Sequence, residues 1–96
     1  MNNNLEDKEA FQNWMWGQMH PQDFLIRWGV IGYTNLGLLC GVSECTVKHW
    51  FEDKTASSYR PPAQRYQRLL SQMDWFLETF DLTPEELIQE YYRENK

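Results

Sequence analysis

The sequence is short of cysteine, of long apolar runs and of positive charge, and the first two shortages each exclude a class of protein. Its two cysteines, Cys40 and Cys45, are too few and too close together to form the disulfide framework of a small secreted domain. The longest apolar stretch covers residues 36–42, far short of the roughly 20 residues that cross a bilayer. Because no basic segment followed by an apolar one opens the chain, we expect a cytoplasmic protein with no membrane association.

Motifs of catalysis and cofactor binding are also missing. The chain has neither a nucleophile motif nor a Gly-rich phosphate loop, and His20 and His49 have no identifiable catalytic partners. Cys45 and His49 are four positions apart, a spacing that suits a metal, but a third ligand would have to be Cys40, which the pattern assigns to the core. A redox-sensing Cys45 beside Lys48 is the alternative role for this thiol. We therefore expect neither an enzyme nor a bound metal or cofactor.

Positive charge is scarce overall but concentrated in the middle of the chain. The net charge of −5 argues against a protein coated in basic residues for wrapping nucleic acid. Residues 1–40 carry −2 and residues 71–96 carry −5, whereas residues 41–70 carry +2. The cations of this middle segment are Lys48, Lys54, Arg60, Arg65 and Arg68. This asymmetry favours an anionic partner for the middle of the chain.

What the sequence does have is helical periodicity and enough apolar residues for one core. Hydrophobic residues make up 42 % of the 96 positions, and no alternating stretch is long enough for a strand. We expect an all-α fold, a compact bundle of five or six helices. The predicted helices cover about residues 5–16, 21–28, 34–40, 44–52 and 61–80, with a last one from residue 84 onward.

The last two of these helices carry specific signals. Pro61 and Pro62 are predicted to open the long helix. Its predicted inward stripe is Tyr66, Leu69, Leu70, Met73, Phe76 and Phe80. Thr83 and Glu86 predict a capping box at the start of the final helix.

The chain divides into three expected parts. Residues 1–20 form an N-terminal extension with an aromatic-rich helix, and residues 21–80 form the main domain. Residues 81–96 form an acidic C-terminal helix that packs on the domain or mediates dimerisation. Trp14 and Trp16 cannot share a helix face, so at least one is expected at the surface. This tryptophan or the acidic helix is a candidate contact for a protein partner.

Residues 36–50 are the most informative segment, because their pattern predicts two helices that cross steeply at a tight turn. Gly37 leaves out a side chain where a second helix must approach closely. Gly41 suits the left-handed conformation that ends a helix, and Ser43 suits the N-cap of the next one.

Core and surface positions then alternate along the second helix. Val47 and Trp50 are expected to face the core, three positions apart. The residues left facing outward are Glu44, Cys45, Lys48, His49 and Glu52. Any tight helical hairpin needs a glycine, an apolar wedge and core residues at this spacing, so the pattern predicts the turn more directly than it predicts a function.

The segment reads Leu-small-x-x-apolar-Gly-Val-Ser-x-x-Thr-Val-x-x-Trp, and it resembles the helix-turn-helix of the phage-repressor-like (Cro and C1 type) DNA-binding family. The likeness covers about 15 residues closely and, through the order of helices, residues 21–92 more weakly. It implies a lambda-repressor-like fold in which residues 44–52 form a major-groove recognition helix.

The resemblance also implies a function and a set of contacts. The protein is expected to be a small bacterial or phage transcriptional regulator that binds double-stranded DNA sequence-specifically, as a homodimer. By position, the implied DNA contacts are Ser43, Glu44, Cys45, Thr46, Lys48 and His49. Arg60, Arg65 and Arg68 are further candidates for phosphate contact, or simply part of a solvated face. The alternative is a protein-interaction module of the same fold, such as an antirepressor, an antitoxin or an RNA-polymerase-associated adaptor, with weak or no DNA binding.

Overall fold

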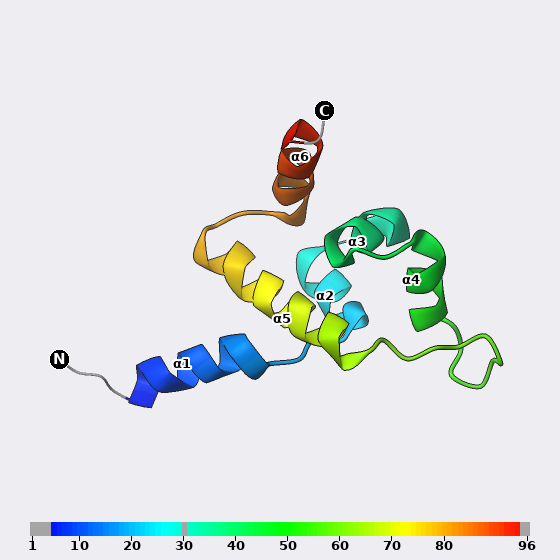
Figure 1. Ribbon diagram of the computed structural model, residues 1–96, viewed down its shortest axis with the longest axis horizontal. Helices are drawn as coiled ribbons and strands as arrows, with labels where there is room; N and C mark the ends of the chain where they lie inside the picture. The colour runs from blue at the N-terminus through cyan, green and yellow to red at the C-terminus, as the bar shows by residue number, and fades with distance from the viewer. Residues whose placement is uncertain (1–4, 30, 95–96) are drawn as a thin grey trace.

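The computed structural model describes residues 5–29 and 31–94, and these residues form six helices and no strand (Figure 1). The helices are α1 (Leu5–Trp16), α2 (Pro21–Trp28), α3 (Gly32–Cys40), α4 (Glu44–Trp50), α5 (Gln64–Thr79) and α6 (Pro84–Glu94). The chain is therefore an all-α bundle, as its periodicity predicts. None of the described helices is long and apolar enough to span a bilayer.

The core forms where α2, α3 and α4 meet the central helix α5. Its buried members are Phe24, Ile31, Leu36, Cys40, Val47, Trp50, Leu70 and Leu77. Full burial of one such aliphatic or aromatic side chain contributes about 1.5 to 3 kcal/mol of transfer free energy. In Figure 1, α5 runs through the middle of the molecule, and α1, α2 and α3 each contact it. This core fixes the positions of α3 and α4.

The start of α5 differs from the prediction. The helix begins at Gln64, not at the Pro61–Pro62 pair, because a proline ring pushes the residue before it out of the α region. Ala63 is also extended, with φ −64° and ψ 154°. The Pro62 carbonyl accepts a hydrogen bond from the Gln67 side chain at 3.1 Å. The two prolines therefore end the preceding loop.

The prediction that Phe76 and Phe80 face inward is wrong. Leu70 and Leu77 are fully buried, whereas Phe76 and Phe80 are 39 % and 57 % exposed. Leu70 and Leu77 lie about two helical turns apart and define the centre of the buried face. Phe76 and Phe80 lie at the edge of this face, where their rings pack against each other with centroids 4.9 Å apart.

The capping box predicted for α6 is present. The Thr83 amide donates to Oε1 of Glu86 at 2.8 Å, and the Glu86 amide donates to the Thr83 hydroxyl at 3.2 Å. The start of α6 is thereby satisfied locally. Ile88 of the same helix is buried, and α6 contacts α3.

α1 packs on α5 and lies at the opposite end of the long axis from α4 (Figure 1). The Trp14 ring is half-buried and meets Trp75 edge-on, with centroids 6.0 Å apart. Trp16 is 60 % exposed. The prediction that one of the first two tryptophans lies at the surface is confirmed.

Candidate nucleic-acid interface

The turn between α3 and α4 brings the two helices into close backbone contact. Gly41 adopts the left-handed conformation, with φ 75° and ψ 31°, and the Val42 amide donates to the Gly37 carbonyl at 2.9 Å. A Cβ atom built on Gly37 would lie only 2.6 Å from the Val42 carbonyl oxygen, closer than real Cβ atoms come. Only glycine at position 37 permits this approach. Both glycines therefore have the roles that the sequence predicts.

Two contacts fix the start and the rotation of α4. Ser43 is the N-cap, with its hydroxyl accepting from the Thr46 amide at 3.1 Å. The Ser43 and Thr46 hydroxyls are also 3.1 Å apart, so they bond to each other. Val47 and Trp50 are buried in the core. Because these two side chains point inward, the opposite face of α4 is directed to solvent.

The exposed face of α4 carries side chains of contrasting chemistry. Glu44, Cys45 and Lys48 are exposed and His49 is half-buried. The Lys48 ammonium lies 3.7 Å from Oε2 of Glu44, one helical turn away. The Cys45 thiol lies 3.7 Å from Nε2 of His49. The face therefore presents a carboxylate–ammonium pair beside a thiol–imidazole pair.

A metal site on this face would need a third ligand. Cys40, the only other cysteine, is buried in the core, and burial raises the pKa of its thiol to about 12. Within residues 5–29 and 31–94, no three His, Cys, Asp or Glu side chains are placed to hold a metal ion.

One contact of the α4 face was missed from the sequence. The Thr34 hydroxyl, in the first turn of α3, donates to Oε1 of Glu44 at 2.8 Å. The two residues are ten positions apart in the chain, and their contact depends on how α3 and α4 cross. No local pattern signals it.

α4 ends at Trp50, two residues earlier than the predicted recognition helix of residues 44–52. A longer helix would use the His49 carbonyl to accept from the amide four residues on. That carbonyl instead accepts from the Arg60 amide at 3.1 Å. The Phe51 amide donates to the Lys48 carbonyl at 3.1 Å and closes the last turn tightly. The returning loop therefore ends α4.

The loop after α4 is held by its own polar side chains. Asp53 accepts from the Thr55 amide at 2.8 Å and from the Thr55 hydroxyl at 2.7 Å. These two hydrogen bonds, the backbone one first, lower the pKa of Asp53. Glu52 accepts a hydrogen bond from the Ser58 hydroxyl and lies 3.7 Å from Nδ1 of His49. The loop is thus tied back to α4.

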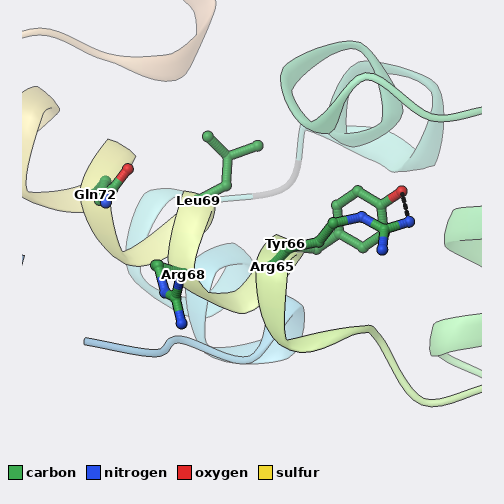
Figure 2. Close-up of a pocket in the computed structure, with 5 residues that line it drawn as sticks. All are labelled: Arg65, Tyr66, Arg68, Leu69 and Gln72. Carbon is green, nitrogen blue, oxygen red and sulfur yellow. Dashed lines mark hydrogen bonds between the residues drawn. The ribbon is translucent and has the colours of Figure 1, made fainter. Parts of the chain in front are cut away.

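Arg60 and Arg65 follow this loop. The Arg60 guanidinium donates to the Ser57 and Tyr59 carbonyls, at 2.8 Å each. The Arg65 guanidinium lies over the Tyr66 ring, 4.7 Å from its centroid, and donates to the Tyr66 hydroxyl at 3.1 Å (Figure 2).

Tyr66 connects Arg65 to the base of α4. Its ring packs against Trp50, with centroids 5.3 Å apart. Arg65 is therefore separated from the end of α4 by two packed rings.

Arg68 lies elsewhere. In Figure 2 its guanidinium points to a different side of α5 from that of Arg65. It lies 4.9 Å from the centre of the Trp16 ring, and its Nε is buried without a hydrogen-bond partner. The structure therefore places Arg68 against α1.

Within the described residues, Lys48 is the one cation of the middle segment with a carboxylate partner, Glu44. Arg27 of α2 is held by Asp74 at 3.0 Å and by Glu78 at 2.6 Å. In the described part of the chain, no carboxylate lies within ion-pair distance of Lys54, Arg60, Arg65 or Arg68. The charges of Lys54, Arg60 and Arg65 are available to an anionic partner, whereas Arg68 packs against Trp16.

No protein-family model, curated protein or solved structure matches the chain. Its function is therefore inferred from the geometry of α3, α4 and the loop that follows.

Proposed function

We propose that the protein is a sequence-specific double-stranded DNA-binding regulator of transcription, of bacterial or phage type, with α4 as its recognition helix. The observation that carries this proposal is the exposed face of α4, followed along the chain by Lys54 and Arg60, which have no carboxylate partner in the described part of the chain. In a helix-turn-helix the second helix enters the major groove and its outward side chains meet base edges. The proposal is supported by the tight turn and the close packing of α3 against α4.

The proposal assigns two kinds of contact. Lys54, Arg60 and Arg65 are suited to phosphate oxygens, which fix the register of a protein on the duplex. The side chains of the α4 face are suited to base edges, which carry the sequence information. Ser43 and Thr46 lie at the start of α4, where hydroxyls and backbone amides contact phosphates in such complexes.

Selection from a pool of randomised duplexes tests the proposal. At roughly 50 mM salt, where phosphate contacts are strongest, we expect the protein to enrich a defined sequence. If Lys54, Arg60 and Arg65 each meet one phosphate, the slope of log K against log salt is about −2.7 per protomer. Retention of no duplex would overturn the proposal.

Two lysine variants separate local contacts from net charge. Lys54→Ala removes a cation that the proposal assigns to phosphate and is expected to reduce the salt slope by about 1. Lys8→Ala removes the same charge from α1, at the other end of the molecule, and should leave the slope unchanged. Equal effects of the two variants would point to non-specific attraction.

Binding as a homodimer is part of the proposal. One seven-residue helix reads only a few base pairs, and two-fold symmetry doubles the contacts. Selected sites are then expected to contain inverted half-sites about 10 base pairs apart, centre to centre. Sedimentation of the complex should give two protomers per site.

A second candidate function is supported by the aromatic surface around α1. Phe11 and Trp75 are 61 % and 42 % exposed. Both rings pack against the Trp14 ring, with centroids 6.1 and 6.0 Å away. Clustered exposed aromatic side chains are typical of protein-binding surfaces. If the selection retains no duplex, a protein-interaction module with this surface becomes the favoured function.

A further inference from the structure

The first turn of α4 holds a carboxylate whose two oxygens are oriented by different helices. Oε1 of Glu44 accepts from the Thr34 hydroxyl of α3 at 2.8 Å, and Oε2 lies 3.7 Å from the Lys48 ammonium of α4. Side chains held in this way lose less conformational freedom on binding than free ones do. Glu44 and Lys48 thus place an acceptor beside a donor on the exposed face of α4.

A carboxylate on this face has little to gain from the phosphate backbone, since two anions repel each other. Cys45 and His49 are turned toward each other, with thiol and imidazole 3.7 Å apart. Glu44 and Lys48 carry formal charges and are exposed, whereas His49 is half-buried.

We infer that Glu44 and Lys48 together read one C·G base pair, with Thr34 as the residue that positions Glu44. This inference rests on the proposed entry of α4 into the major groove. Cytosine presents an amino donor there, and guanine presents two acceptors, O6 and N7. An ionised carboxylate only accepts and an ammonium only donates, so Glu44 matches cytosine and Lys48 matches guanine.

An A·T pair fits this arrangement less well. Its purine offers Lys48 only N7, next to an amino group that opposes the ammonium, and its pyrimidine carries a methyl group beside O4. Replacing the C·G pair by A·T should therefore weaken binding by about tenfold or more, in the range of a good base contact.

The decisive variant is Glu44→Gln, which keeps the shape of the side chain and removes its charge. An amide both accepts and donates, and glutamine pairs with N6 and N7 of adenine. In a selection with this variant, one position of the enriched site should change from C·G to A·T while the other positions stay the same. Glu85→Gln, which removes an equal charge from α6, should select the site of the unaltered protein.

Thr34→Val tests the positioning role, because valine keeps the shape of threonine and lacks the hydroxyl. We expect the same preferred base pair with reduced discrimination, and a thermal unfolding midpoint close to that of the unaltered protein. Thr34→Ser restores a hydroxyl and should restore discrimination.

Failure of the C·G inference and failure of the proposed function give different results. If Glu44→Gln enriches the same base at every position, the C·G inference is overturned while DNA binding stands. If the unaltered protein retains no duplex, both the inference and the proposed function fail.

Discussion

At the scale of single residues, position 37 tolerates the least change. In Gly37→Ala, the new Cβ would meet the Val42 carbonyl oxygen, a backbone atom that cannot rotate away. We expect this variant to lower the free energy of unfolding by about 1 to 3 kcal/mol, as overpacking does. Alanine is otherwise the better helix former, by about 1 kcal/mol. An unfolding midpoint in urea that is unchanged or raised would show that α3 and α4 can separate without cost.

The two cysteines provide a second prediction at this scale. Cys45 is exposed on α4, whereas burial raises the pKa of Cys40 to about 12. Only a thiolate reacts readily with iodoacetamide, so at pH 8 the folded protein should be alkylated at Cys45 and not at Cys40. Peptide mass spectrometry identifies the labelled residue.

Alkylation also tests the position of Cys45 on the proposed interface. The bulk added to α4 should abolish DNA binding, and Cys45→Ser should bind DNA and resist the reagent. Denatured protein should label at both positions. Rapid labelling of Cys40 in the folded protein would contradict its placement in the core.

How far a residue's role could be predicted depends on the range of the contact. Gly41 and Ser43 were predictable because a left-handed helix end and an N-cap are local requirements. Thr34 was not, because its bond to Glu44 depends on the crossing of α3 and α4. The position of Arg68 against Trp16 was not predictable either, because it depends on how α1 packs on α5.

At the scale of elements, α4 offers a way to separate stability from binding. Its N-cap is Ser43, whose hydroxyl accepts from the Thr46 amide. Ser43→Ala should lower the free energy of unfolding by about 1 kcal/mol, since it removes this bond. Ser43→Asp keeps a good cap and should keep the stability, but it adds a negative charge at the end of α4 that would face DNA.

Stability and DNA affinity are expected to rank these variants differently. Thermal melting should rank Ser43→Asp with the unaltered protein, and titration with the selected duplex should rank it below Ser43→Ala. Ser43→Asn caps without charge and serves as the control, with both properties kept. Equal affinities of the Asp and Asn variants would contradict the placement of α4 against phosphates.

The bounds of the helices show the same dependence on range. The start of α6 was predictable because Thr83 and Glu86 satisfy each other within one turn. The end of α4 was not, because a loop amide eleven residues further on, that of Arg60, takes the His49 carbonyl. Periodicity also predicted that Phe76 and Phe80 face inward. They lie at the edge of the buried face, whose centre is formed by Leu70 and Leu77, and both are exposed.

At the scale of the whole molecule, the chain is flat, with extents of 52 × 37 × 20 Å. Its thinnest dimension corresponds to about two layers of helices. α1 and α4 lie at opposite ends (Figure 1), so the aromatic surface around α1 and the proposed DNA face are separate. If both proposed surfaces are used, a protein partner and a duplex are expected to bind at the same time.

The two terminal helices, α1 and α6, are expected to contribute unequally to stability. Among residues 8–16 of α1, whose burial is described, none belongs to the buried core. Deleting residues 1–16 should therefore remove mainly two contacts. The Trp14–Trp75 pair contributes about 0.5 to 1.5 kcal/mol beyond the area that it buries, and the Trp16–Arg68 contact about 0.5 to 1 kcal/mol. Selection by the shortened protein should return the same DNA site.

Deleting residues 84–96 should cost more, because α6 contributes the buried side chain of Ile88. Ile88→Ala alone is expected to lower the free energy of unfolding by about 2 to 5 kcal/mol, as other large-to-small core changes do. Urea unfolding of both truncations and of this point variant measures the difference. If removal of α1 destabilises the protein as much as removal of α6, or abolishes DNA binding, then α1 belongs to the folded unit that presents α4, and the two ends of the molecule are not independent.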